Sequence, residues 1–570
     1  MIKTNLCYVN TIEQFLQKRR EGYGIPYIRM ENDLKIKLFD YFKLRKDDGD
    51  EELLCYAVFA YRYYAIVDKE ENESFSSTPS PKYNYVLGHF SEAIKILHSL
   101  YAKGNLEACS YLAWYWFDYG PFDHRNGYYL TRNLDYAMFY ANDCINKGYA
   151  YGWGIRAYIE SQNITDGEQK SAISYTKGIE NGCDICAERA WLCVPTNTHN
   201  WSYCLSNDFD AFDAPDMDKY FALLKGANDR VDDPYNQAML GEMYYEGIGT
   251  ICDYEKAYSL CQKDVWMDSF LDSDYVVNNN GLTILAYFGL HFLYPEKYNN
   301  PIGIMKKFST NPLAQMEYCL RLENYEEYAK CAIKAYNNKR DFPDYQYEKI
   351  DVAMGRCYLA GWGVARDTER AKKLLCQYPS GKAYLADAHY NGWCVPYDLA
   401  EAYRLCKESE GEYLSKYVLA NMYLHGFYVK QDEEKGIQYL IDGGYNYKYG
   451  ANLLAYYYHV GAIVDKDEMQ AIRYYTCALN DGNGGAGNNM GLIYEYSPKY
   501  KNYQKAFNCY YRSAHCKDSG GAISLGRCYE NGIGCPVDKG KALEIYKIAK
   551  RWGNGEAQKF IDNLNSQGIY

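Results

Sequence analysis

One position recurs about every 35 residues through the second half of the chain, and this period constrains the fold more than any other feature. It is usually a glycine that stands three residues after a tyrosine. The recurring positions are Gly247, Gly361, Gly392, Gly426, Gly461, Ser497 and Gly532. From Gly361 onward the intervals are 31, 34, 35, 36 and 35 residues. A near-constant period of this length indicates stacked copies of one small structural unit.

The residues before each glycine predict a helix that ends there. In the sharpest copy Leu525, Tyr529 and Gly532 are spaced i, i+4 and i+7, which places them on one helical face. Gly526, next to the leucine, leaves room for a neighbouring helix to approach closely. The final glycine can adopt the left-handed backbone that commonly terminates a helix.

An Asp or Asn follows each recurring position by five or six residues and predicts the start of a second helix. These residues are Asp253, Asp367, Asp398, Asp432, Asp467, Asn502 and Asp538. Their side-chain oxygens can accept from the unpaired amides of a helix's first turn. A small residue stands four positions later, as at Ala542. Each copy is therefore expected to be a helix, a glycine-rich turn and a capped helix.

The pattern apolar-Gly-x-x-Tyr-x-x-Gly-x-Gly-Val-x-x-Asp-x-x-Lys-Ala resembles the Sel1-like repeat, a relative of the tetratricopeptide repeat. The copies from Leu240 to Ala257 and from Leu525 to Ala542 carry the resemblance most clearly. Single copies depart from it at His389, Cys394 and Ser497. The resemblance implies an all-α fold, a right-handed α-solenoid (superhelix) of helix-turn-helix repeats.

Repeat quality divides the chain into seven segments. We expect an N-terminal helical segment or cap at 1–69, a linker or loop at 70–85, divergent repeats at 86–233, a clear repeat at 234–262, degenerate helical repeats with insertions at 263–349, six repeats at 350–555, and a C-terminal capping helix and tail at 556–570. A chain of 570 residues is also too long for one compact core, which agrees with an array.

Charge and cysteine usage limit the classes of partner and compartment. A net charge of −12 argues against a nucleic-acid partner and against attachment to anionic lipid. The N-terminus lacks the apolar run of a signal peptide, and no segment approaches the length of a membrane span. The 21 cysteines are odd in number and irregularly spaced, which favours a reduced, cytoplasmic protein without membrane insertion.

No motif of catalysis, cofactor binding or metal binding stands out. Glycine pairs such as Gly532 and Gly534 follow a predicted helix, whereas phosphate-binding loops follow a strand. Cys183 and Cys186 have redox or zinc spacing but lack a second pair, and zinc prefers four ligands. The nine histidines form no known metal or catalytic motif. We therefore expect no enzyme activity, no cofactor and no metal.

Similarity to tetratricopeptide domains implies that the first helices line a concave groove. The lining positions fall mainly two, five and six residues after the conserved apolar residue. They are Glu242, Tyr245, Glu246, Arg356, Asp387, Tyr390, Asn391, Asn421, Leu424, His425, Tyr456, His459, Glu495, Tyr496, Arg527, Glu530 and Asn531. This mixture suits an extended peptide or a partner helix with basic and polar residues.

These observations favour a protein-protein interaction scaffold or adaptor. One alternative is a small-molecule-binding or hydrolytic protein, because some Sel1-like proteins are linked to β-lactams. A second is an RNA-binding helical-repeat protein, which the acidic balance opposes. The partner's identity and the oligomeric state do not follow from the sequence.

Overall fold

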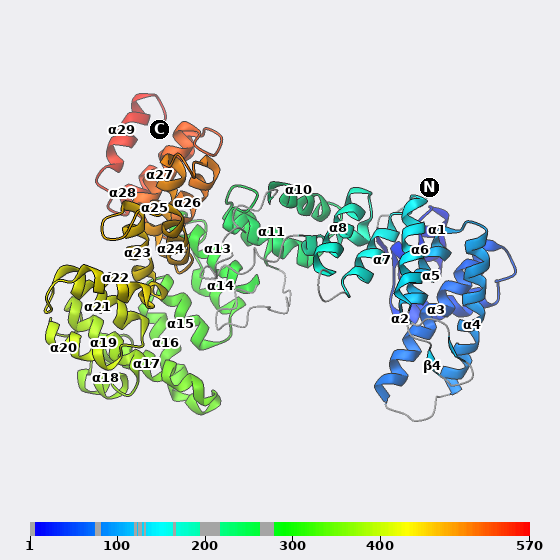
Figure 1. Ribbon diagram of the computed structural model, residues 1–570, viewed down its shortest axis with the longest axis horizontal. Helices are drawn as coiled ribbons and strands as arrows, with labels where there is room; N and C mark the ends of the chain where they lie inside the picture. The colour runs from blue at the N-terminus through cyan, green and yellow to red at the C-terminus, as the bar shows by residue number, and fades with distance from the viewer. Residues whose placement is uncertain are drawn as a thin grey trace. The chain divides into compact units, whose positions relative to one another are not determined.

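The computed structural model describes residues 6–74, 81–118, 122–123, 128–129, 133–162, 167–193, 217–262 and 279–570. The chain divides into two compact units. The first contains residues 1–196 and 219–239, and the second contains residues 197–218 and 240–570. Both units are built from paired helices (Figure 1). The expectation of an all-α solenoid is confirmed, and the described strands are only two residues long.

The first unit begins with helices that do not follow the repeat. These are α1 (Ile12–Arg20), α2 (Asn32–Lys43), α3 (Asp50–Ser74) and α4 (Pro81–Ala102). Short strands β1 (Cys7–Tyr8) and β2 (Ile28–Arg29) pair in parallel. Phe15, Phe42 and Phe59 are buried together, with ring centroids 5.3 to 6.1 Å apart. Helix α3 ends at Ser74 and α4 begins at Pro81, so both reach into the predicted linker, and the two helices pack on each other. Residues 75–80 of that linker lie outside the described residues.

The rest of the first unit consists of helix pairs without the glycine motif. The elements are α5 (Leu106–Asp118), β3 (Phe122–Asp123), β4 (Tyr128–Tyr129), α6 (Leu134–Asn146), α7 (Tyr151–Glu160), α8 (Gly167–Glu180), α9 (Asp184–Ala187) and α10 (Met217–Asn228). Helix α5 packs on α6, and α7 packs on α8. Asn133 caps α6, accepting from the amides of Asp135 and Tyr136. Each of these two pairs is a helical hairpin.

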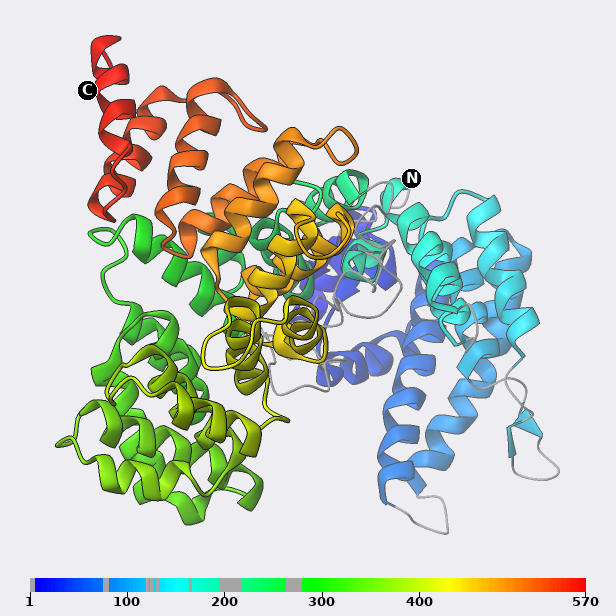
Figure 2. The same cartoon turned by 60° about the vertical axis from the view of Figure 1, so that its left-hand side comes forward.

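The clear repeats form first and second helices in alternation. The first helices are α11 (Pro234–Glu246), α17 (Tyr347–Ala360), α19 (Pro379–Asn391), α21 (Tyr413–His425), α23 (Lys448–Val460), α25 (Gly484–Tyr496) and α27 (Ser519–Asn531). The second helices are α12 (Tyr254–Leu260), α18 (Thr368–Leu375), α20 (Leu399–Glu408), α22 (Glu433–Ile441), α24 (Glu468–Asn480), α26 (Tyr503–His515) and α28 (Lys539–Arg551), and α29 (Ala557–Ser566) follows them. Figure 2 shows the helices from α24 to α29, coloured orange to red, side by side in chain order.

Between α12 and α17 the chain stays helical although the glycine motif is absent. Its helices are α13 (Asn279–Leu293), α14 (Pro301–Phe308), α15 (Pro312–Arg321) and α16 (Tyr325–Asn337). Residues 263–278 lie outside the described residues.

The turns have the predicted geometry. Gly361, Gly392, Gly426, Gly461 and Gly532 each end a helix in the left-handed region, with φ between 69° and 77°. Every expected Asp or Asn cap accepts from a backbone amide of the helix it precedes. The cap amide also donates back to the carbonyl of the repeat's tyrosine or its equivalent, as in the 2.8 Å bond from Asp538 to Tyr529.

The small residue on each first helix is required by its own second helix. A Cβ atom on Gly526 would lie 2.3 Å from the ring of Tyr546, and one on Gly241 would lie 2.2 Å from the Cys261 sulfur. Such distances are far inside van der Waals contact, so a side chain at either position would push the two helices apart.

One contact in the second unit joins repeats that are distant in sequence. The turn after α11 lies on α26, where buried Asn508 accepts from the Cys252 amide at 2.8 Å and donates to the Gly247 and Thr250 carbonyls at 2.9 and 3.0 Å. Burial lowers the pKa of His515 to about 3, and its neutral ring packs 4.4 Å from the ring of Tyr254. The first clear repeat is therefore held by a later one as well as by its neighbours.

No helix among the described residues carries an apolar stretch long enough to cross a bilayer.

Candidate functional site

The expected lining positions lie on the first helices α11, α17, α19, α21, α23, α25 and α27. Their side chains occupy different environments. Some of these side chains form a connected aromatic and charged surface. Others are buried, and the rest form hydrogen bonds within one repeat.

Arg356 of α17 lies between two tyrosine rings. Its guanidinium carbon is 5.3 Å from the ring centroid of Tyr328 and 4.5 Å from that of Tyr384 on α19. The Tyr384 ring in turn packs against Trp393, with centroids 4.9 Å apart. A guanidinium held between aromatic faces gains from cation–π attraction while its chain is kept in one position. Arg356 is thus a fixed cation that links two repeats.

Asp387, Tyr390 and Asn391 share the end of α19. Asn391 donates to the Asp387 carboxylate at 2.9 Å and to the Asp387 carbonyl at 3.0 Å. Burial raises the pKa of Asp387, and the nearby Arg356 opposes this rise. Burial also raises the pKa of Tyr390 to about 12, and its ring lies 6.4 Å from Phe427. Asp387 therefore lies close enough to Arg356 for the two charges to interact.

Helix α21 differs from the expectation. Leu424 is only 3% exposed and packs in an apolar cluster with Leu440 and Leu454. Asn421 is also buried, and its amide donates to the Tyr417 carbonyl at 2.9 Å. The expected exposure of these two side chains is wrong, because this helix is covered more widely than the spacing rule assumes. Of the three expected side chains on this helix, only His425 is exposed, and its ring lies 5.5 Å from that of Phe427.

Helix α23 presents Tyr456 and His459. Tyr456 is 48% exposed. His459 lies within 3.5 Å of the Tyr475 hydroxyl, and burial lowers the pKa of its imidazole.

Helices α25 and α27 hold Glu495, Tyr496 and Arg527 in one hydrogen-bonded group. Buried Glu495 accepts from the Tyr510 hydroxyl at 2.7 Å and from Arg527 at 2.8 Å. Burial alone would raise the pKa of Glu495, but these bonds and that of Tyr496 hold it below its ordinary value. Arg527 also donates to the hydroxyl of Tyr496 at 2.9 Å, and Tyr496 is 60% exposed.

The last two expected positions are held locally. Glu530 accepts from the Tyr546 hydroxyl at 2.8 Å, and the exposed Asn531 donates to the Arg527 carbonyl at 3.0 Å. Their polar atoms therefore help to fix the last repeat, α27–α28.

The α11 positions face another helix. Glu246 forms an ion pair with Arg512 of α26 at 2.5 Å, and Tyr245 stacks on Tyr254 with centroids 4.5 Å apart. Glu242 is half-buried. Contact with α26 therefore uses Tyr245 and Glu246, which we expected to face a partner.

Four tyrosines near Asp387 were missed by the spacing rule. They are Tyr384, Tyr417, Tyr447 and Tyr449, and together with Arg356 and Asp387 we call them the tyrosine cluster. The ring of Tyr447 lies 5.2 Å from that of Tyr417 and 5.4 Å from that of Tyr449. Burial raises the pKa of all three, and the Asp387 charge adds to the rise. Tyr384 and Tyr417 stand three or four residues before expected positions, so extending the same helical face toward the N-terminus would have found them.

The described residues contain no group of three or more His, Cys, Asp or Glu placed to hold a metal ion. Cys183 and Cys186 are both buried, and the Cys183 sulfur lies 3.6 Å from the hydroxyl of Tyr27.

Comparison with known proteins identifies repeats in the same places. The Sel1 repeat model matches residues 237–263, 352–377, 379–409, 414–441, 448–483, 486–518 and 521–551. A curated protein from Rattus norvegicus, "DAP3-binding cell death enhancer 1", is 28% identical over 104 residues. That match covers 18% of this chain, and this chain spans only 20% of the relative.

Two solved structures also resemble the chain. One is c5321, a protective antigen of uropathogenic Escherichia coli strains with an SLR fold, at 18% identity, covering 84% of this chain and 83% of that one with a TM-score of 0.35. The other is a Sel1 repeat protein from Oxalobacter formigenes, at 16% identity, covering 69% and 89% with a TM-score of 0.34.

Proposed function

Because this chain is a Sel1-repeat protein, with seven matched repeats, we propose that it is a non-enzymatic scaffold that binds a protein or peptide partner along its first helices. Sel1-repeat proteins generally mediate protein-protein interactions. We further propose that the protein acts in the cytoplasm and binds no nucleic acid. The name of the rat relative records binding to DAP3, and we carry over only the class of partner, a protein.

The tyrosine cluster is the observation that carries this proposal. It takes side chains from α17, α19, α21 and α23, so one partner segment crossing these helices would contact several repeats at once. Tyrosines give contact area at low entropic cost, because only two side-chain torsions must be fixed. Tyr449, which is 47% exposed, supplies an open ring at this surface.

The chemistry of the cluster favours a partner segment with basic and polar residues. Open aromatic faces and the Asp387 carboxylate both attract a lysine or arginine side chain. The fixed guanidinium of Arg356 would repel a second cation placed next to it. It would instead donate hydrogen bonds to a backbone carbonyl or a carboxylate of the partner. We therefore expect a mixed polar segment rather than a uniformly basic one.

Peptide display against the full chain, followed by affinity measurement of the selected peptides, tests the proposal. Tyr449→Ala should weaken binding by about tenfold, because aromatic truncation at the centre of an interface typically costs about 1–2 kcal/mol. Tyr503→Ala is the matched control, since Tyr503 is also 47% exposed but lies at the start of α26. Failure to select any peptide, or equal losses in both variants, would contradict the proposed site.

A further inference from the structure

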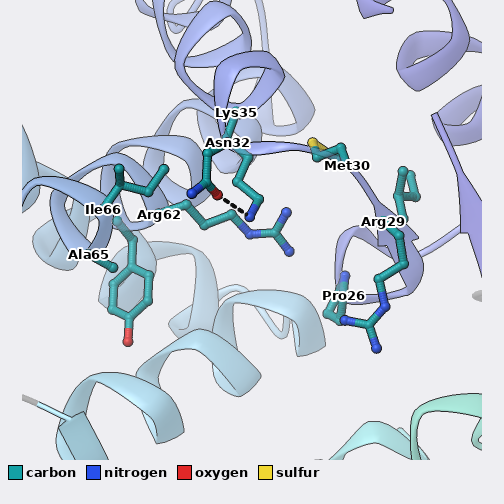
Figure 3. A pocket seen from close by; sticks show the side chains of 10 residues that line it. Pro26, Arg29, Met30, Asn32, Lys35, Arg62, Ala65 and Ile66 are labelled. Carbon is teal, nitrogen blue, oxygen red and sulfur yellow. Dashed lines mark hydrogen bonds between the residues drawn. The ribbon is translucent and has the colours of Figure 1, made fainter. Parts of the chain in front are cut away.

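The first unit contains a pocket formed entirely by residues before the first matched repeat. Its volume is about 550 Å³, and it is lined by the segment from Pro26 to Met30, the first turn of α2 and one face of α3 (Figure 3). This volume is typical of small-molecule sites, which usually measure about 300–1,000 Å³. The pocket is distinct from the tyrosine cluster.

Three cationic side chains line this pocket. Figure 3 shows the Lys35 ammonium beside the Arg62 guanidinium, with Arg29 on the wall that carries Pro26. They come from three separate elements: Arg29 from β2, Lys35 from α2 and Arg62 from α3. The chain as a whole carries a net charge of −12, so this local excess of positive charge opposes its general balance.

The hydrogen bonds of Lys35 and Arg62 go to uncharged groups. Lys35 donates to the Asn32 side-chain oxygen at 2.8 Å. Arg62 donates to the Tyr111 hydroxyl at 2.7 Å and to the Ile25 carbonyl at 3.4 Å. These acceptors are all neutral, and neither cation forms an ion pair with a carboxylate within the described part of the chain. Arg29 differs, because it pairs with Glu188.

The three cations also act on one another. Burial lowers the pKa of Lys35, and the charges of Arg62 and Arg29 lower it further, while Glu31 opposes them. Like charges placed this close destabilise the empty pocket, and a bound anion would relieve that repulsion. Clustered cations around a pocket therefore indicate a complementary ligand.

We propose that this pocket binds a small organic oxyanion, a carboxylate or a phosphate monoester. Its charged oxygens would contact Lys35 and Arg62, and its apolar part would lie on Ile28 and Ile66. A guanidinium matches the oxygen spacing of either anion, and an ammonium adds a point charge. Apolar walls with a few converging polar groups are the usual construction of such sites. This inference does not rest on the proposed scaffold function.

Calorimetric titration of the full chain at low salt tests the proposal. The probes are phenyl phosphate and phenylacetate, which separate a phosphate preference from a carboxylate preference, and benzyl alcohol as the neutral analogue. We expect at least one anion to bind and benzyl alcohol to show no binding. Binding by neither anion, or equal binding of the neutral compound, would overturn the proposal.

Lys35→Gln is the decisive variant, because within the described part of the chain the Lys35 ammonium donates a hydrogen bond to Asn32 of the same helix, so its loss should leave the fold intact. It should weaken anion binding by about tenfold or more, as expected for losing a charge-assisted hydrogen bond. Lys37→Gln is the matched control, since Lys37 is exposed on the same helix and does not line the pocket. Arg62→Lys keeps the charge, so it should retain weaker binding and show whether the guanidinium geometry contributes. Unchanged anion affinity in Lys35→Gln, or an equal loss of affinity in Lys37→Gln, would show that the anion binds outside this pocket and would overturn the proposal.

Discussion

The repeats formed by α25–α26 and α27–α28 are adjacent and equal in length, yet they are stabilised differently. All four helices contain 13 residues. In the second repeat Gly532 ends α27 in the left-handed region at φ 73°. In the first, Ser497 takes its place with an extended backbone at φ −67°. Even so, the cap amide reaches the tyrosine carbonyl in both turns at 2.8 Å, from Asn502 to Tyr494 and from Asp538 to Tyr529.

In the α25–α26 turn, hydrogen bonds of the Ser497 side chain hold the backbone where the other repeat relies on a glycine. The Ser497 hydroxyl accepts from the amides of Lys499 and Tyr500 at 3.2 and 3.3 Å and donates to the Glu468 carboxylate at 2.5 Å. The outer faces differ too. Asn508 on α26 is buried beneath the turn of the first repeat, whereas Glu544, at the same position on α28, is exposed. A repeat that lacks its defining glycine can therefore be held by bonds from outside its own hairpin.

The largest effect should come from adding a side chain to the glycine turn. A Cβ on Gly534 would lie 2.0 Å from the carbonyl oxygen of Tyr503, and φ there is +71°. Gly534→Ala should destabilise α27–α28 by about 3 kcal/mol, because backbone strain and overpacking add. Hydrogen exchange of these helices measures the loss. Lys499→Ala in the shorter turn should cost less than about 0.5 kcal/mol, as usual for an exposed site. Similar losses of stability in Gly534→Ala and Lys499→Ala would show that the two turns do not differ.

The next largest effect should follow from removing the long-range contact. Asn508→Ala deletes three hydrogen bonds to the turn after α11 and should cost about 2–3 kcal/mol, since buried backbone groups lose their partners. Exchange of the Cys252 amide, which donates to Asn508, should accelerate most. Glu544→Ala is the equivalent change on α28 and should leave exchange throughout the second unit unaltered. If the Cys252 amide stayed as protected from exchange in Asn508→Ala as in the unaltered protein, the contact would be refuted.

A smaller effect, which depends on pH, is expected at Ser497. Its hydrogen bond, together with Lys466, holds the pKa of Glu468 below its ordinary value. A depressed carboxyl pKa stabilises the folded state above the unfolded pKa, about 4.3 for Glu, and this contribution is lost as pH falls through the folded pKa. Ser497→Ala should therefore cost about 1–2 kcal/mol at neutral pH and less in acid. Denaturant unfolding at several pH values is the measurement, and a pH-independent loss would disprove the role of Glu468.

The smallest effect should be a gain in stability in a third repeat. Cys394 stands where other copies have their second glycine, and its φ is +61°. Cys394→Gly should stabilise the protein by about 0.5–1 kcal/mol, because a left-handed backbone costs a non-glycine residue about that much or more. Thermal unfolding measures the shift. Destabilisation instead would mean that packing of the Cys394 side chain outweighs its strain.

Local signals predicted the repeats well because each depends on a few neighbouring residues. Glycine at helix ends and Asp or Asn at helix starts act through backbone geometry within one turn, so Gly361 and Asp367 could be placed from the sequence. Leu424 and Tyr245 could not, because their surroundings come from other parts of the fold. Leu424 is covered by the next helices, and Tyr245 lies against a repeat some 250 residues later. The pocket at Lys35 was missed for the same reason, since its cations come from three elements without a shared motif.

The contact between Cys252 and Asn508 spans 256 residues, which has a consequence for synthesis of the chain. A ribosome adds about 5–20 residues per second, so the turn after α11 emerges on the order of tens of seconds before α26 exists. Neighbouring hairpins can form as they appear, whereas this contact must wait until 256 further residues have been made. Until then Tyr254 and Cys252 lack their covering helix and present an apolar surface to chaperones or to other nascent chains.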